Sequence, residues 1–172
     1  MENKSLNNVI VYGGGVIGNL VSLCLKGNGF DVCQIKSDIK QSIDRTYALS
    51  PGSVDWIKTI GLRDKFFSSL YPIKNIEIIR QDSKTNLSAD LVFQPALAYM
   101  VSEKNLMKEI QIKLESEDVK IFSEPKKINL DNSLDEVLVK LEKESIRASI
   151  LVACDGANSK IKEHLNIRKK IK

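Results

Sequence analysis

The feature that most constrains this chain is a glycine-rich turn placed directly after a short apolar run near its start. Val9-Ile10-Val11-Tyr12 is typical of a buried parallel strand, and Gly13-Gly14-Gly15-Val16-Ile17-Gly18 follows it. Apolar residues then recur at helical spacing up to Leu25. In this strand–turn–helix setting the G-x-G-x-x-G string predicts a loop that binds the diphosphate of a nucleotide. The alternative interpretation is a glycine-rich turn that binds no ligand.

Each glycine of the string has a separate expected role. Gly13 permits the tight turn, Gly15 lets the backbone approach a diphosphate, and Gly18 lets the helix lie close to the strand. The amides of Val16 and Ile17 then stand at the start of the helix, where backbone N–H groups stabilise phosphate charge.

The second strand of such a unit usually ends in an acid that accepts hydrogen bonds from ribose hydroxyls, and here that position falls at Lys36. A lysine has donors and no acceptor, so the loss of one charge-assisted hydrogen bond weakens binding by about 1.5–3 kcal/mol. Three interpretations stay open. Asp38 replaces the acid, or Lys36 binds a phosphate as basic residues do in NADP sites, or Lys36 is merely solvated.

Two further places carry candidate binding residues. Arg45 follows the second strand and can reach a diphosphate or a flavin edge through forked hydrogen bonds, although a surface salt bridge with Asp44 explains it equally well. Asp155 and Gly156 follow a buried strand predicted over 150–153, at the end of the strand where open α/β sheets bind ligands. The alternative there is a helix N-terminal turn capped by a nearby polar residue.

Alternating strand and helix signals along the chain predict an α/β protein. We expect helices over 51–60, 102–114 and 159–165. In the first of them we expect Ser53 to be the N-cap and Trp56 to lie in the hydrophobic core of the protein. We expect the remaining strands over 30–35, 76–79, 91–93, 119–122, 127–130, 136–141 and 150–153.

Composition excludes several classes of function. The chain has 172 residues and a net charge of +4, which is too small to indicate nucleic-acid binding without a localised patch. Three widely spaced cysteines form no C-x-x-C, so we expect no disulfide framework and no zinc site. We expect no other metal site, and the cysteine content fits a reducing cytoplasm. The single histidine, His164, argues against chemistry that needs two imidazoles.

Several of these segments, taken in order, resemble one family. The glycine loop, Asp44-Arg45 with Ala48-Leu49-Ser50, Gly61-Leu62, Leu97–Val101 with Leu106, and Asp155-Gly156-Ala157-Asn158-Ser159 are similar to the N-terminal part of the class A flavoprotein monooxygenases. Within that family, the resemblance is strongest to the aromatic-ring hydroxylases of ubiquinone biosynthesis, the UbiH/UbiF type. It covers residues 8–167.

The resemblance implies a Rossmann-like FAD-binding α/β domain, with helices on a mixed parallel sheet. It implies that Gly13, Gly15 and Gly18 hold the FAD diphosphate, that Arg45 contacts FAD, and that Asp155 and Gly156 lie near the diphosphate. The implied reaction hydroxylates an aromatic ring of a ubiquinone precursor, with FAD as cofactor and NAD(P)H and dioxygen as co-substrates. No catalytic side chain is assigned.

The sequence departs from this family at Lys36, where a glutamate is usual, at Lys162, where an arginine is usual, and in length. We therefore expect residues 1–172 to be a partial FAD-binding domain, with the substrate sheet beginning around 75–101 and the C-terminal remainder absent. Such a chain is expected to be inactive by itself. The alternatives are a non-catalytic module that binds FAD or NADP, or a remnant that needs a partner chain supplying the missing half.

The basic tail, Arg168–Lys172, is consistent either with a solvated terminus or with a peripheral contact to anionic lipid. We expect a cytoplasmic location, either free in the cytoplasm or associated with a membrane surface.

Overall fold

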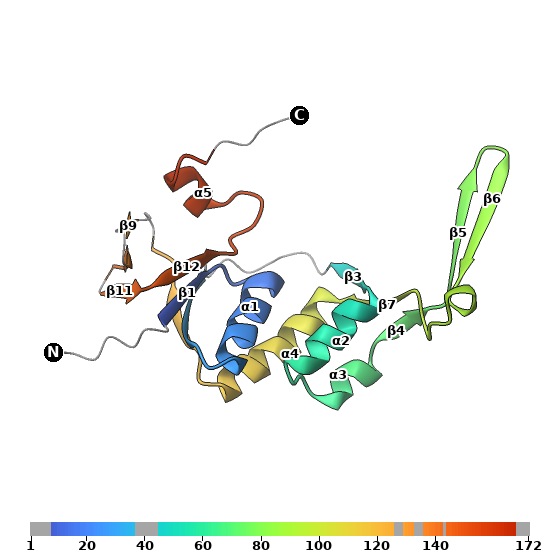
Figure 1. Cartoon of the computed structure of the whole chain (residues 1–172), viewed down its shortest axis with the longest axis horizontal. Helices are drawn as coiled ribbons and strands as arrows, with labels where there is room; N and C mark the ends of the chain where they lie inside the picture. Colours follow the sequence, from blue (N-terminus) through green and yellow to red (C-terminus); the bar gives the residue numbers. More distant parts are fainter. Residues whose placement is uncertain (1–7, 37–44, 126–128, 133–135, 143, 168–172) are drawn as a thin grey trace. The chain divides into compact units, whose positions relative to one another are not determined.

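The computed structural model describes residues 8–36, 45–125, 129–132, 136–142 and 144–167. The chain divides into two compact units (Figure 1). The first combines residues 1–40 with 112–172, and the second comprises residues 41–111. Among the described residues, no helix is both long and apolar enough to cross a membrane.

The first unit contains a parallel sheet that carries the glycine turn. Its strands are β1 (Asn8–Tyr12), β2 (Asp31–Lys36), β8 (Lys120–Ser123) and β12 (Ile150–Ala153), in the order β12-β1-β2-β8. All three neighbouring pairs are parallel. Since β2 and β12 lie on opposite sides of β1, the winding reverses at β1, and open α/β sheets bind ligands outside the carboxyl ends of the strands at such a point.

Apolar side chains of the sheet alternate between two covered faces, as the two-residue period of a strand requires. On one face Val9, Val11 and Val32 are buried against Val21 and Leu25 of α1 (Val16–Gly27). These contacts explain why a twelve-residue helix follows the turn: its apolar stripe covers the sheet.

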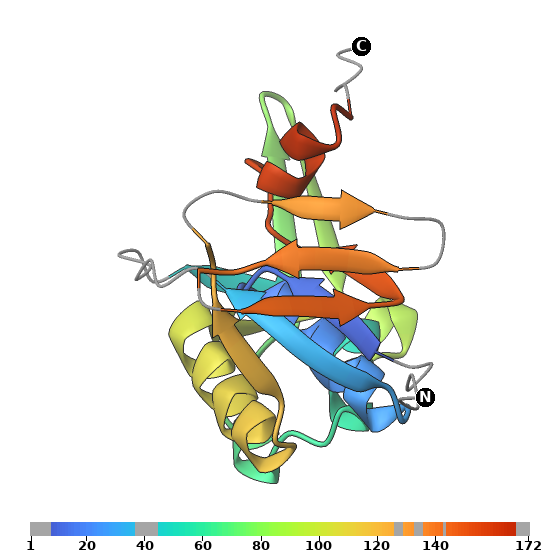
Figure 2. The ribbon, with the colours of Figure 1, turned by 90° about the vertical axis from the view of Figure 1, so that its left-hand side faces the viewer.

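The opposite face is covered by antiparallel strands. A meander of β9 (Leu130–Asn132), β10 (Val137–Lys140) and β11 (Ser145–Ala148) lies across the parallel sheet, as the orange strands in Figure 2 show. Val139 and Ala148 pack there with Ile10, Tyr12 and Ile35. The connection from β8 to β12 therefore runs through a small sheet and not through a helix.

The second unit is built on an antiparallel sheet in the order β3-β7-β4. Its strands are β3 (Thr46–Leu49), β7 (Ala98–Ser102) and β4 (Tyr71–Ile73), and its helices are α2 (Pro51–Thr59), α3 (Asp64–Ser68) and the start of α4 (Glu103–Ser116). The Arg63 guanidinium donates two hydrogen bonds to the nearly buried Glu109 carboxylate, at 2.7 and 2.6 Å, and so ties the start of α3 to α4.

The unit also carries an exposed hairpin of β5 (Asn75–Arg80) and β6 (Ser83–Ser88). The strand predicted over 91–93 is wrong. A short 3-10 helix, η1 (Asp90–Val92), stands there, and Phe93 takes a left-handed conformation with φ 54° and 94% exposure. Turn hydrogen bonds from the Val92 and Phe93 amides satisfy this backbone locally, so the short apolar run joins no sheet.

Two expectations for α2 are also wrong. Ser50, and not Ser53, is the N-cap: its hydroxyl accepts from the Ser53 amide at 3.1 Å, because Pro51 already occupies the first turn. Trp56 is 43% exposed, since the buried side of the helix carries Val54 and Ile57. The strand predicted over 127–130 falls partly outside the described residues, and β9 begins at Leu130.

The difference in burial between the parallel sheet and the β5–β6 hairpin predicts different effects of substitution on stability. Ile10 is fully buried, so Ile10→Ala should lower the free energy of unfolding by about 2–5 kcal/mol. Ile79 in the hairpin is 72% exposed, so Ile79→Ala should change it by no more than about 0.5 kcal/mol. Urea unfolding followed by circular dichroism measures both, and equal losses would contradict the assignment of the core.

Candidate nucleotide-binding site

The turn after β1 lies against the end of β12. Gly13 has φ +130°, and its amide donates to the Ile35 carbonyl at 2.8 Å. A Cβ atom on Gly13 would come within 2.3 Å of the Cys154 carbonyl oxygen and 2.9 Å of the Asp155 nitrogen. Only glycine allows both this conformation and this approach. The turn and Asp155 therefore meet at the carboxyl edge of the sheet.

Gly18 and Gly15 have opposite surroundings. A Cβ atom on Gly18 would lie 2.1 Å from the Gly13 carbonyl oxygen, so the helix can approach the turn only without that side chain. No other heavy atom lies within 4 Å of the Cβ position at Gly15, among the neighbours that the structure describes. Gly15 is also the N-cap of α1 and makes no side-chain cap, which leaves the first-turn amides of Val16 and Ile17 available to an anion.

A buried glutamine supports the turn from below. Gln34, fully buried on β2, donates from Nε2 to the Gly13 carbonyl at 3.0 Å and to Asn19 Oδ1 at 2.8 Å. These bonds hold the turn to both β2 and α1. Gln34 was not predicted from the sequence; the available signal was one amide side chain between the apolar residues Cys33 and Ile35.

Lys36 stands at the end of β2, beside the turn. A Cβ atom on Gly14 would lie 2.5 Å from Lys36 Cβ and 3.1 Å from its Cδ, so the lysine stem lies across Gly14. The side chain is half-buried, and no carboxylate of the described residues forms an ion pair with its ammonium group. Asp38, the possible substitute acid, lies outside the described residues.

Asp155 has a structural role that the sequence also allowed. Its Oδ2 atom accepts from the Ile161 amide at 3.2 Å, and Ser159 Oγ accepts from the Lys162 amide at 3.0 Å, so both cap α5 (Lys160–His164). Gly156 follows in an exposed turn with φ +81°. The helix cap holds the Asp155 carboxylate at the start of α5, while the Asp155 backbone lies beside Gly13.

A polar network at the same edge joins β1, the residue that follows β8, and α5. The Tyr12 hydroxyl donates to Glu124 Oε1 at 3.0 Å, and Lys160 Nζ lies 2.9 Å from the same oxygen. Burial, followed by the charge of Glu124 and its hydrogen bond, raises the pKa of Tyr12 well above its usual value. Tyr12 thus stays protonated at physiological pH and anchors the network.

Arg45 belongs to the second unit, where it directly precedes β3 and is exposed. Its carbonyl accepts from the Glu103 amide at 2.6 Å. Asp44, its alternative ion-pair partner, lies outside the described residues. The expected contact of Arg45 with FAD stays a prediction.

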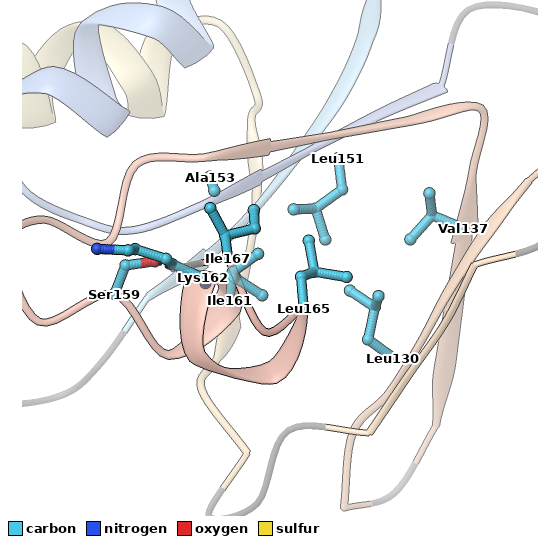
Figure 3. A pocket seen from close by; sticks show the side chains of 9 residues that line it. All are labelled: Leu130, Val137, Leu151, Ala153, Ser159, Ile161, Lys162, Leu165 and Ile167. Atoms are coloured by element: carbon cyan, nitrogen blue, oxygen red, sulfur yellow. Dashed lines mark hydrogen bonds between the residues drawn. The ribbon is translucent and has the colours of Figure 1, made fainter. Parts of the chain in front are cut away.

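An apolar pocket of about 210 Å³ lies between α5, β12 and the meander (Figure 3). Leu151, Leu165 and Ile167 point into it, and Lys162 and Ser159 are its polar lining residues. The lining holds no carboxylate, imidazole or thiol, and the Ser159 hydroxyl already accepts from the Lys162 amide as the cap of α5.

The turn therefore suits the diphosphate of FAD, because it combines open space at Gly15 with the first-turn amides. At the ribose end, Lys36 offers donors where an acceptor is usual.

The two glycines should separate folding from binding. Gly18→Ala places a methyl group 2.1 Å from a backbone oxygen, so it should lower both the unfolding midpoint and FAD affinity. Gly15→Ala has room and an ordinary φ of −75°, so it should keep stability and weaken FAD by about tenfold or more through obstruction of the diphosphate. Thermal unfolding and calorimetric titration measure the pair. If Gly15→Ala binds FAD with unchanged affinity, the assignment of the diphosphate to this turn is wrong.

Partial burial should also lower the reactivity of the Cys33 thiol. Desolvation first, and then the charge of Asp31, raise its pKa from 9.0 to about 11. In a Cys24→Ala, Cys154→Ala variant, the alkylation rate of native Cys33 should rise about tenfold per pH unit until the pH nears 11. In urea the rate should level off above pH 9, the ordinary value. A native plateau already at that pH would contradict the burial of the thiol.

Comparison with known proteins finds similar sequences and similar folds. The family model described as FAD binding domain matches residues 7–172. The ubiquinone biosynthesis monooxygenase COQ6 of Caenorhabditis elegans is 23% identical over 184 residues, covering 95% of this chain and 41% of that protein. The ubiquinone hydroxylase UbiL of Rhodospirillum rubrum is 26% identical over 168 residues, covering 92% of this chain and 39% of that protein. The chain thus spans about two fifths of the length of these relatives.

Solved structures share the fold. The p-nitrophenol 4-monooxygenase PnpA of Pseudomonas putida DLL-E4 aligns with a TM-score of 0.77 at 21% identity, over 93% of this chain and 43% of that chain. The flavin-dependent monooxygenase PieE, solved with FAD and substrate, aligns with a TM-score of 0.77 at 15% identity, over 94% and 32%. The expected α/β FAD-binding fold with a parallel sheet is confirmed, and this chain belongs to the FAD binding domain family.

Proposed function

We propose that this chain is the FAD-binding part of a flavin-dependent monooxygenase that hydroxylates an aromatic ring of a ubiquinone precursor. The observation that carries the proposal is the similarity to COQ6 and UbiL, which extends over more than nine tenths of this chain. The glycine turn at the switch point supports it, because the turn offers first-turn amides and open space to a diphosphate.

The redox chemistry that FAD supplies when bound is the transfer of electrons from NAD(P)H to dioxygen. The chain's own residues bind and orient. In this proposal the amides of Val16 and Ile17 donate to the diphosphate, Gly15 leaves room for it, and Asp155 with Gly156 limits it from the side of β12. Arg45 is a further contact of FAD. The substrate is a small aromatic or quinone-precursor molecule.

The substrate sheet of the enzyme would begin within 75–101, which contains the β5–β6 hairpin. Ile76, Ile78 and Leu87 of the hairpin are 40–46% exposed, which supports further protein packing on it. The proposal therefore places catalysis in a longer protein or a complex, and the isolated chain is inactive. A cytoplasmic enzyme in peripheral contact with a membrane through residues 168–172, which lie outside the described residues, is part of the same proposal.

Two other functions each have one observation in their favour. Lys36 at the ribose position favours a module that binds a nucleotide, FAD or NADP, without turnover. The exposed hairpin favours a remnant that needs a partner chain supplying the missing half.

The cofactor is tested by titration of the purified chain with FAD. Bound FAD should keep its oxidised absorption band near about 450 nm after gel filtration. Arg45→Ala should weaken binding by about tenfold, because it removes a forked, charge-assisted contact. Arg80→Ala, an equal charge loss in the exposed hairpin, should have no effect and serves as the control. If FAD does not bind, or the two variants behave alike, the assignment of Arg45 or of the cofactor fails.

The enzyme is tested on the gene. A reading frame that continues past Lys172 into a second Gly-Asp motif, and whose product hydroxylates a ubiquinone precursor with NAD(P)H and dioxygen, would support the monooxygenase. A colourless chain that binds NADP more tightly than FAD supports the module. An aggregating chain that becomes soluble only with a C-terminal fragment supports the remnant.

A further inference from the structure

We propose that the ribose end of the glycine loop binds a phosphate group through Lys36, so that the loop prefers an adenine nucleotide with a ribose 2′-phosphate over one with free ribose hydroxyls. This inference rests on the proposed nucleotide role of the loop and adds the class of ligand that the same site favours. FAD carries no phosphate at that ribose, so the preference is a property of this chain and not of the cofactor.

The position of Lys36 is fixed by the sheet. Tyr12 and Ile35 are paired across β1 and β2, so Lys36 is the next residue beyond the pair, level with the start of the turn. Its Cβ, Cγ and Cδ atoms lie along Gly14, at 2.5, 3.3 and 3.1 Å from a Cβ atom built there. The stem is thus held against the turn at the end of β2, which is where dinucleotide folds recognise the ribose.

The chemistry of this position is that of a donor. An ammonium group offers three donors and no acceptor, so it cannot accept the hydrogens of two ribose hydroxyls. In the part of the chain that the structure describes, no nearby carboxylate charge reverses this. The Glu124 amide donates to the Lys36 carbonyl at 2.8 Å, but the Glu124 carboxylate is already bound by Tyr12 and Lys160. A lysine without an ion-pair partner among the described residues is a binding group for an anion.

The rest of the loop is preformed for an anionic ligand. Gln34 fixes the Gly13 carbonyl from below, and the first-turn amides of α1 are uncapped at Gly15. A nucleotide whose diphosphate meets those amides brings its adenosine ribose toward the end of β2. With free hydroxyls, the ribose accepts a hydrogen bond in which only the ammonium group of Lys36 is charged. With a 2′-phosphate, both partners are charged, so Coulomb attraction adds to the charge-assisted hydrogen bond.

The test compares ADP-ribose with 2′-phospho-ADP-ribose, which differ only in that phosphate, by calorimetric titration of the full chain. The wild type should bind the phosphorylated ligand at least about tenfold more tightly than ADP-ribose, and added salt should reduce this ratio of affinities. Lys36→Met keeps the stem over Gly14 and should bring the ratio near one. Lys36→Glu should reverse the preference and tighten FAD. Lys120→Met is the control with the same charge loss. Lys120 begins β8, whereas Lys36 pairs with Ser123 at the other end of that strand, so the ratio should stay unchanged.

The outcomes separate this inference from the proposed function. Equal affinity of the wild type for the two ligands, while FAD and both ligands bind, overturns the inference and leaves the nucleotide role intact. A preference that persists in Lys36→Met also overturns it. If neither ligand nor FAD binds a chain with a normal unfolding transition, the proposed function fails as well.

Discussion

The close approach of three backbone segments underlies the site: the end of β1, the start of α1 and the end of β12. Gly13 lies against the Cys154 carbonyl and Gly18 against the Gly13 carbonyl, at distances that no side chain would permit. Because the segments touch through backbone, the first-turn amides and Asp155 are brought to one edge of the sheet. Every proposed binding contact in the first unit depends on this junction.

The two faces of the parallel sheet explain why the junction holds. Apolar side chains alternate along β1, so that Val9 and Val11 face α1 while Ile10 and Tyr12 face the meander. Both faces are buried, as parallel sheets require. Buried polar groups on the two sides, Gln34 and Tyr12, are each bonded to residues of other elements.

Much of this was predictable from local pattern. The strand–turn–helix at residues 9–25 and the amphipathic stripe of α4 follow from periodicity, because each element buries its own apolar face. The 3-10 helix at Asp90–Val92 was not predictable, because the three apolar residues at 91–93 are too few to show a helical or strand period. Ser50 was overlooked as a cap because the choice between two serines depends on the position of Pro51.

The site shows the same division. The glycines could be identified from their spacing, and Asp155 from its place after a strand. Gln34 and the Tyr12–Glu124–Lys160 network could not, because their partners are distant in the sequence and share no spacing rule. Long-range polar contacts are specified by the tertiary arrangement of the elements, which a local pattern does not encode.

The pairing of β1 with β12 has a consequence for the birth of the protein on the ribosome. The glycine turn leaves the exit tunnel well before Cys154, which it touches and which lies far along the sequence. Contacts between such distant segments close late in folding. A nascent chain therefore exposes the turn without its neighbour until β12 has been made, and the three segments of the site come together only then.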